Sequence, residues 1–276
     1  MNIGCRAHDF GRASAEELAT RIAAKGLTCV QLAPSKALDG VVWGRGALTP
    51  ALAADVGKTF RRHGIDIAVL GCYVNPIHPD RGVRRELLEI FKEHLRVARD
   101  FGCTVVALET GSMNADYSPH PDNHTEATFL ELVTSISELV EAAEAADVLV
   151  GVEAVTVHTV STPALMRRLL DAVASDHIGV VHDPVNLLDV ENWRAQGRIF
   201  QEAFDLYGDR IVAVHAKDFK VDEGGLKYRA LGKGGLLDQC SAFSWIAKNK
   251  PDTPFLLEEI DEQTVIETME AGREIC

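Results

Sequence analysis

The chain is short of the features that would suit it to nucleic acid or to a membrane. It carries 28 Lys and Arg against 41 Asp and Glu in 276 residues, a formal net charge of −13. A nucleic-acid surface needs clustered basic residues to replace phosphate counterions, so no nucleic-acid partner is expected. No run of about 18 apolar residues occurs, so no membrane partner is expected either.

Cysteine is also sparse and shows no functional spacing. The six cysteines show no CxxC pair and no spacing typical of a disulfide framework. Four of them lie in or beside predicted strands: Cys5, Cys29, Cys72 and Cys103. They are predicted to be small buried hydrophobes in a reducing compartment. The N-terminal segment has no basic region followed by an apolar run, so a soluble, cytoplasmic protein is expected.

What the chain does contain is a regular alternation of short β-branched runs with longer amphipathic stretches. The predicted strands are 3–5, 29–32, 67–72, 105–108, 148–153, 178–183, 211–215 and 255–258. The predicted helices are 14–24, 50–63, 82–101, 126–145, 163–174, 190–207, 238–249 and 262–273. Eight strand–helix pairs in about 250 residues predict a (β/α)8 TIM barrel as a single domain over residues 1–276. A doubly wound open sheet is the alternative, less favoured because no phosphate-cradling glycine loop follows the first strand.

Local residues support these helix boundaries. Thr49-Pro50 and Ser161-Thr162-Pro163 are typical of helix starts, with a capping hydroxyl and a proline in the first turn. Glycines close four of the predicted helices and are expected to adopt the left-handed C-terminal cap: Gly26, Gly64, Gly102 and Gly208.

Four polar residues stand at the C-terminal ends of the last four predicted strands. They are Glu153, Asp183, His215 and Glu258. Neighbouring side chains on a strand point to opposite faces. The residues that share a face are Glu153 with Gly151, Asp183 with Gly179, and His215 with Ala213. Small residues suit a crowded barrel interior, so these polar groups should point inward at the face where barrel active sites occur.

The last strand is less decisive. Choosing Glu258 leaves Phe255 and Leu257 outward, and Glu259 is the alternative.

A single acid at a strand end usually caps a helix or pairs with a surface lysine. Four convergent groups instead predict a bound cation that supplies the missing positive charge. Three carboxylates and one imidazole favour Mn²⁺, Mg²⁺ or Co²⁺, with Zn²⁺ as an alternative.

With these residues in place, the sequence resembles the xylose isomerase-like barrels, in particular the sugar phosphate isomerase/epimerase group. The motifs that carry the resemblance are the four strand-end residues, His182-Asp183-Pro184-Val185-Asn186, His215-Ala216-Lys217-Asp218 and Leu231-Gly232-Lys233-Gly234. The resemblance covers essentially the whole chain. It implies a divalent-metal-dependent isomerase or epimerase of a sugar or sugar phosphate, which transfers a proton through a metal-stabilised enediolate. It also implies that Glu153 and Glu258 are the acid–base pair and metal ligands, and that Asp183 and His215 are fixed ligands.

Further residues are candidates for substrate binding. Asn186 occupies the position where related epimerases carry a substrate-binding histidine. His158 either reaches the barrel mouth or caps the following helix, and Lys217 shares the parity of His215. Glu109 and His8 follow earlier strands and are candidates for substrate hydroxyls. His182 has outward parity and is interpreted as a helix-packed histidine, while Phe10, Trp43 and Tyr73 are candidates for walls of the sugar site.

One segment departs from the resemblance. Ketose epimerases of this group carry an arginine shortly after the seventh-strand histidine, and here the chain reads Asp218-Phe219-Lys220-Val221. Lys227 or Arg229 is a candidate replacement. The departure leaves open a lyase or dehydratase on the same barrel, by inosose-type dehydration or glycosyl-bond cleavage. An endonuclease IV-type nuclease is a third and less favoured alternative.

Barrels of this group often self-associate, so a homo-oligomer is an open expectation. A small carbohydrate is the expected substrate.

Overall fold

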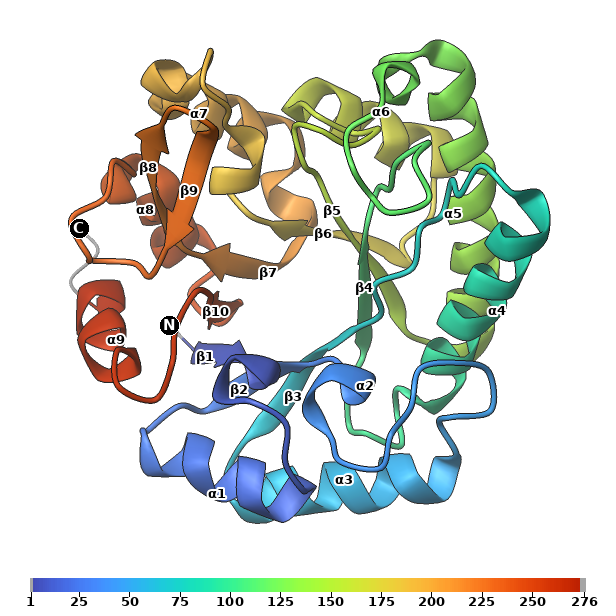
Figure 1. Cartoon of the computed structure of the whole chain (residues 1–276), viewed down its shortest axis with the longest axis vertical. Coiled ribbons are helices and arrows are strands. Elements are labelled where there is room, and N and C mark those ends of the chain that lie inside the picture. Colours follow the sequence, from blue (N-terminus) through green and yellow to red (C-terminus); the bar gives the residue numbers. More distant parts are fainter. Residues whose placement is uncertain (1, 274–276) are drawn as a thin grey trace.

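The eight predicted strands pair in parallel and close into one barrel (Figure 1). The computed structural model describes residues 2–273, and the strand order around the barrel is β1-β10-β7-β6-β5-β4-β3-β2. The barrel strands are β1 (Asn2–Arg6), β2 (Cys29–Leu32), β3 (Asp66–Gly71), β4 (Val105–Glu109), β5 (Leu149–Glu153), β6 (Ile178–His182), β7 (Ile211–Ala216) and β10 (Pro254–Leu257). The predicted (β/α)8 fold is confirmed.

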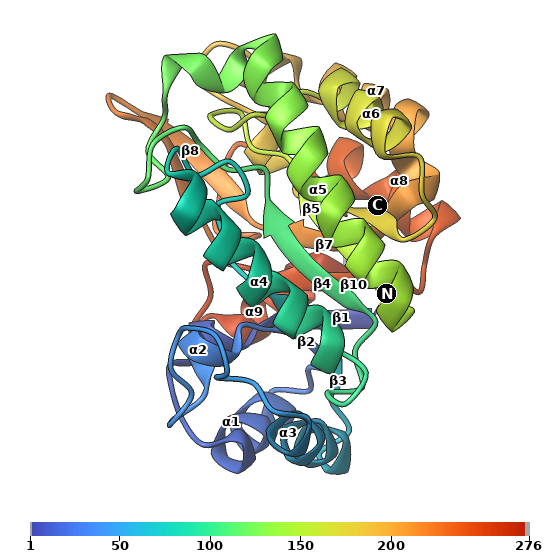
Figure 2. The ribbon, with the colours of Figure 1, turned by 90° about the vertical axis from the view of Figure 1, so that its right-hand side faces the viewer.

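Helices surround this barrel on all sides (Figures 1 and 2). They are α1 (Ala15–Ala24), α2 (Pro34–Ala37), α3 (Pro50–Arg62), α4 (Arg81–Val97), α5 (Glu126–Ala146), α6 (Pro163–Val173), α7 (Gln196–Tyr207), α8 (Gln239–Asn249) and α9 (Val265–Arg273). Short 3-10 turns lie at Ala7–Phe10, Pro121–His124, Val185–Leu187, Trp193–Ala195 and Gly208–Arg210. In the described part of the chain, no helix combines the length and apolar character needed to cross a membrane.

The predicted caps are largely present. The hydroxyls of Thr49 and Thr162 accept hydrogen bonds from backbone amides of the first turns of α3 and α6. Three of the four predicted C-terminal glycines have positive φ: Gly26, Gly64 and Gly102. The prediction for Gly208 is wrong, because its φ is −55° and it begins a 3-10 turn. A Cβ at Gly208 would lie 2.6 Å from the Trp245 ring, so close packing and not a left-handed turn requires glycine there.

The barrel interior is filled by small and medium side chains, as the strand parity predicts. One buried cluster contains Cys29, Val69, Val105, Ala107, Val181, Ala213 and Leu256. The missing side chain of Gly151 leaves room for its neighbours, since a Cβ there would lie 3.1 Å from both Val105 and Val181. Cys5, Cys72 and Cys103 are likewise buried. The bulkier outward set packs under the helices in the main core.

An antiparallel hairpin, which the sequence analysis did not predict, stands between β7 and α8. It consists of β8 (Asp218–Asp222) and β9 (Gly225–Arg229), with Phe219 opposite Tyr228. Figure 1 shows it beside α7 and α8, and Figure 2 shows that it projects beyond the barrel at one end. The carboxylate of Asp218 accepts hydrogen bonds from the backbone amides of Phe219 and Leu237, which ties the base of the hairpin to the segment before α8.

A glycine in the first strand provides a test of the crowded interior. A Cβ at Gly4 would lie 2.1 Å from the carbonyl oxygen of Cys29. Gly4→Ala should therefore lower the free energy of unfolding by about 1–3 kcal/mol or more, because backbone must move. Gly224→Ala is the matched control, since the nearest atom is the flexible Lys227 ammonium at 3.6 Å, and should change stability by less than about 0.5 kcal/mol. Equal urea midpoints for the two variants would contradict this packing.

Candidate metal centre

Three of the four predicted strand-end residues meet inside the barrel mouth. Glu153 ends β5, Asp183 follows β6 and His215 lies in β7. Each offers a ligand atom, and these atoms all lie within 4.8 Å of one another. The exposed fractions of these residues are 7%, 2% and 2%, so the group is removed from bulk water.

Glu258 lies next to this trio, directly after β10. It is buried, and its Oε1 is 3.2 Å from His215 Nδ1. Leu256, which shares its parity, belongs to the barrel interior. The neighbouring Glu259 is exposed, has a φ of 57° and pairs with Arg6. The orientation expected for Glu258 over Glu259 is therefore present, while its role as a fourth ligand stays a prediction.

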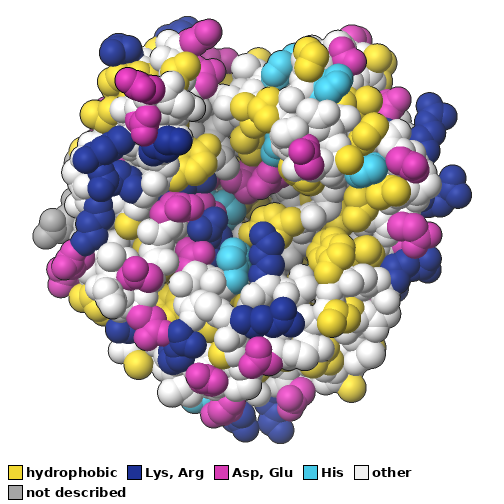
Figure 3. All heavy atoms as spheres, in the orientation of Figure 1, with side chains coloured by type: hydrophobic (Ala, Val, Ile, Leu, Met, Phe, Trp, Pro, Cys, Tyr) yellow, Lys and Arg dark blue, Asp and Glu magenta, His cyan; other side chains and the backbone are white. Residues whose placement is uncertain are grey.

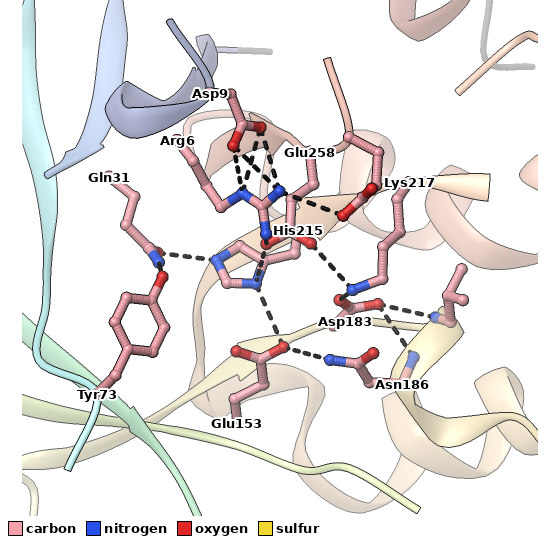
Figure 4. Close-up of polar contacts among 12 residues, drawn as sticks. Arg6, Asp9, Gln31, Tyr73, Glu153, Asp183, Asn186, His215, Lys217 and Glu258 are labelled. Carbon is pink, nitrogen blue, oxygen red and sulfur yellow. Dashed lines mark hydrogen bonds and ion pairs between the residues drawn. The ribbon is translucent and has the colours of Figure 1, made fainter. Parts of the chain in front are cut away.

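A lysine supplies positive charge within this acidic group. Lys217 is 4% exposed, and its Nζ lies 2.5 Å from Asp183 Oδ2 and 2.9 Å from Glu258 Oε2 (Figure 4). Burial opposes the charge, but the two carboxylates outweigh it and raise the pKa of Lys217 well above its ordinary value. Lys217 is thus a fixed cation that bridges two of the predicted ligands.

Burial and neighbouring charges shift the pKa values of these groups in different directions. Burial opposes ionisation of Glu258, yet the charges of Lys217 and His215 leave its pKa well below the ordinary value. Burial dominates at Asp183 and raises its pKa to about 6. Burial opposes the charge of His215, but Glu258 and Glu153 raise its pKa to about 9. Glu258 therefore carries a stable negative charge beside two cationic groups.

Amide groups fix two of the candidate ligands. Asn186 Nδ2 donates to Glu153 Oε1 at 2.7 Å. The backbone amides of Val185 and Asn186 donate to Asp183 Oδ1 at 2.9 and 3.1 Å. The predicted substrate-binding residue Asn186 thus holds a carboxylate, and it also lines the cavity beside that carboxylate.

The donor set fits a divalent cation. Glu153, Asp183 and His215 offer oxygen and nitrogen atoms within one buried space, and in the described part of the chain no cysteine joins that group. Oxygen-rich sets with one imidazole suit Mn²⁺, Mg²⁺ or Co²⁺, and Zn²⁺ also accepts such ligands. A cation held by these residues would replace repulsion between carboxylates with attraction.

Two adjoining cavities open at this site. The inner cavity, of about 280 Å³, is lined by Arg6, Tyr73, Glu109, Glu153, Val155, Asn186, His215, Lys217, Tyr228, Glu258 and Glu259. The outer cavity, of about 400 Å³, is lined by Arg6, His8, Lys36, Tyr73, Glu109, Tyr117 and His158. Three residues line both. Figure 3 shows acidic, basic and histidine side chains gathered around the hollow near the middle of this face.

The predicted substrate-binding residues divide between these cavities. Glu109 lines both, and burial and the charge of Glu153 raise its pKa to about 7. His158 reaches the outer cavity, with its Nδ1 3.2 Å from Glu109 Oε2. His8 lines the same cavity, and burial lowers the pKa of both histidines to about 4. Both imidazoles are therefore neutral at pH 7.

Other sequence expectations have mixed outcomes. His182 packs against Phe204 and Tyr207 outside the barrel, as its parity predicts. Lys227 and Arg229, the candidate replacements for the arginine, are not among the residues that line the two cavities. Their neighbour Tyr228 of β9 does line the inner cavity. Tyr73 lines both cavities, whereas Phe10 is a core residue and Trp43 contacts His94.

Two residues at the centre of the site were not predicted from the sequence. Arg6, at the end of β1, lies 3.4 Å from Glu258 Oε1 and also pairs with Asp9. Gln31, in β2, accepts a hydrogen bond from His215 Nε2 at 2.8 Å. Both share parity with small interior residues, Gly4 and Cys29, so strand parity in the first two strands was the available signal.

Comparison with known proteins gives the family. The sequence profile of the xylose isomerase-like TIM barrel family matches residues 19–275. The chain belongs to this family. The xylose isomerase-like chain is also 27% identical over 200 residues to "Putative L-ribulose-5-phosphate 3-epimerase SgbU" of Escherichia coli (strain K12), a match that covers 70% of this chain and 66% of that protein. The chain therefore spans just under two thirds of the length of that relative.

Solved structures share the barrel at low sequence identity. A D-tagatose 3-epimerase-like protein matches with a TM-score of 0.77 and 17% identity, over 100% of this chain and 97% of that one. An IOLI protein with a bound zinc atom matches with a TM-score of 0.74 and 16% identity, over 99% of this chain and 96% of that one. At such identities the likeness shows the fold.

Metal binding by the trio can be measured without a substrate. Mn²⁺ at 100 times its dissociation constant should stabilise the wild-type protein by about 2.7 kcal/mol, because only the folded state brings the ligands together. Asp183→Asn should lose most of this gain in a thermal-shift titration, since one buried ligand charge is removed. Asp55→Asn, an exposed carboxylate on α3, is the control and should keep the full response. An unchanged response in Asp183→Asn would rule out Asp183 as a ligand.

Proposed function

We propose that this protein is a divalent-metal-dependent isomerase or epimerase of a sugar or sugar phosphate. The observation that supports this most strongly is the placement of two buried glutamates. Glu153 Oε1 and Glu258 Oε1 lie 3.3 and 3.2 Å from His215 Nδ1, and they come from β5 and β10. Since β6 and β7 lie between those strands, the carboxylates enter the cavity from separate parts of the barrel rim.

Such a pair suits proton transfer at a carbon next to a carbonyl. A C–H bond of this kind is a weak acid, so the negative charge that develops on oxygen must be stabilised. A divalent ion, when bound, supplies that charge stabilisation. One glutamate removes the proton and the other returns a proton, and each positioned acid–base group contributes typically about 10²–10⁴-fold.

Neighbouring residues fit supporting roles. Asn186 holds Glu153 in place through its amide, and Lys217 holds Glu258 through its ammonium. Because Lys217 lies within the inner cavity wall, it also places positive charge where an oxyanion would form. Glu109, on the boundary of the two cavities, is placed to bind a substrate hydroxyl.

The combined cavities accommodate more than the reacting carbons. Proton transfer takes place in the inner cavity, and the outer cavity receives the rest of the sugar, with Lys36 at its wall as a hydrogen-bond donor to hydroxyl or phosphate oxygens. Two of the named relatives carry the names of a putative L-ribulose-5-phosphate 3-epimerase and a D-tagatose 3-epimerase-like protein. We therefore propose a ketose or ketose phosphate as the substrate class, with cytoplasmic carbohydrate metabolism as the setting.

Solvent deuterium exchange tests this function directly. Wild-type enzyme with Mn²⁺ should incorporate deuterium at the carbon next to the carbonyl of its ketose or ketose phosphate substrate. Glu153→Gln and Glu258→Gln should each reduce exchange by about 10²-fold or more, because a proton carrier is lost. Glu270→Gln, an exposed glutamate on α9 that lines neither cavity, should keep exchange near the wild-type rate.

Mass spectrometry of the products separates the alternatives in the same experiment. Isomerisation and epimerisation leave the substrate mass unchanged apart from deuterium, whereas loss of water or of an aglycone would indicate a lyase. Wild-type exchange in both glutamine variants would overturn the acid–base assignment. Absence of exchange with every ketose, inosose and phosphate ester would overturn the proposed chemistry.

A further inference from the structure

A buried chain of hydrogen bonds joins the metal centre to the cavity wall. His215 Nε2 is 2.8 Å from Gln31 Oε1, and Gln31 Nε2 donates to the Tyr73 hydroxyl at 3.0 Å (Figure 4). Gln31 is only 2% exposed. Every polar group of its side chain is thus engaged away from bulk water.

The direction of the first bond follows from the charges around the imidazole. His215 Nδ1 faces two carboxylates, Glu153 at 3.3 Å and Glu258 at 3.2 Å, so this is the ring nitrogen that faces the candidate ligands. A ligating Nδ1 must present its lone pair, which leaves the ring proton on Nε2. Gln31 Oε1 accepts that proton, and an acceptor on the far nitrogen fixes the ring orientation of a metal-binding histidine.

The direction of the second bond is then determined. With its oxygen committed to His215, the amide of Gln31 can offer only N–H groups to Tyr73. The phenol oxygen therefore acts as an acceptor in this bond, and its own proton must point elsewhere. Tyr73 lines both cavities, so that proton is available to a substrate oxygen. Burial raises the pKa of Tyr73 well above its ordinary value, which keeps the proton in place at neutral pH.

Space filling alone does not account for Gln31. The residues that fill the barrel below it, such as Cys29 and Val69, are apolar. A buried amide without partners costs free energy, so its presence among apolar neighbours requires the two bonds that it makes. Arg6, its partner in the β1–β2 register, is committed to Asp9 and Glu258 and has no bond to it among the described contacts.

We propose that Gln31 is a positioning residue with two separable functions. It holds the Nε2 proton of His215, so that Nδ1 is directed to the metal, and it orients Tyr73 as a hydroxyl donor to a substrate oxygen. The second function rests on the proposed sugar chemistry, and the first does not.

Three variants separate these functions. Gln31→Leu removes both bonds and should weaken Mn²⁺ binding by roughly 10- to 100-fold, measured by isothermal titration calorimetry. Gln31→Glu keeps an acceptor for His215, so Mn²⁺ affinity should equal or exceed that of the wild type. Its carboxylate also draws the Tyr73 proton away from the cavity. It should therefore share the loss expected for Tyr73→Phe, roughly a 2- to 10-fold fall in kcat/KM.

A spectroscopic measurement reports the first function without turnover. In the Zn²⁺-loaded wild type, the ¹⁵N signals of His215 should show a protonated Nε2 and a metal-bound Nδ1. Gln31→Leu should show exchange broadening or a mixture of ring states. Thr59→Val, which alters a buried polar residue on α3, should leave both the spectrum and Mn²⁺ affinity unchanged.

The outcomes keep the two proposals distinct. Wild-type Mn²⁺ affinity in a folded Gln31→Leu variant would overturn the role at the metal. Wild-type kcat/KM in Gln31→Glu would overturn the role through Tyr73. If Gln31→Leu does not fold, Gln31→Glu and Tyr73→Phe still decide the second role, and the zinc-loaded wild-type spectrum decides the first. If no sugar undergoes exchange, the proposed function fails while the metal-affinity result stands.

Discussion

The repulsion between buried carboxylates at the barrel mouth is the constraint on which the rest of this site depends. Glu153, Asp183 and Glu258 are each less than 10% exposed and converge on one imidazole. Taking such charges out of water costs several kcal/mol per ion unless opposite charge lies close by. Lys217 supplies one positive charge and contacts two of the three. Arg6 also pairs with Glu258, and the His215 imidazole faces Glu153 and Glu258. A divalent cation would add positive charge at the Glu153 and Asp183 carboxylates.

A narrow barrel interior brings these charged side chains together. Glycine and alanine below the polar layer, at Gly4, Gly151 and Ala213, let the strands carry charged side chains to one level at their C-terminal ends. The 3-10 turn after Asp183 directs two backbone amides at that carboxylate. Position along a strand, and not local sequence motif, therefore determines which residues meet. Metal binding and proton transfer remain proposals that this geometry supports.

Strand parity is why much of this arrangement was predictable from the sequence. Alternation placed Glu153, Asp183 and His215 inward, separated His182 from them and favoured Glu258 over Glu259. The hairpin at Asp218–Arg229 was not predicted, because a short two-stranded segment has no strong periodic signal and is marginally stable on its own. Gln31 was missed because a single amide in a buried strand has no motif. Its role depends on His215, which is 184 residues away.

The most direct test of a metal centre is anomalous X-ray diffraction from crystals grown with Mn²⁺. A single strong peak per chain is predicted, within coordination distance of Glu153, Asp183 and His215. The Glu258 carboxylate should lie next to that peak. Lys217 should then give up at least one of its contacts with Asp183 and Glu258, because the ion and the ammonium compete for the same carboxylate oxygens. A well-ordered site without a peak, in which the Lys217 ammonium still bridges Asp183 and Glu258 at saturating Mn²⁺, would contradict the account.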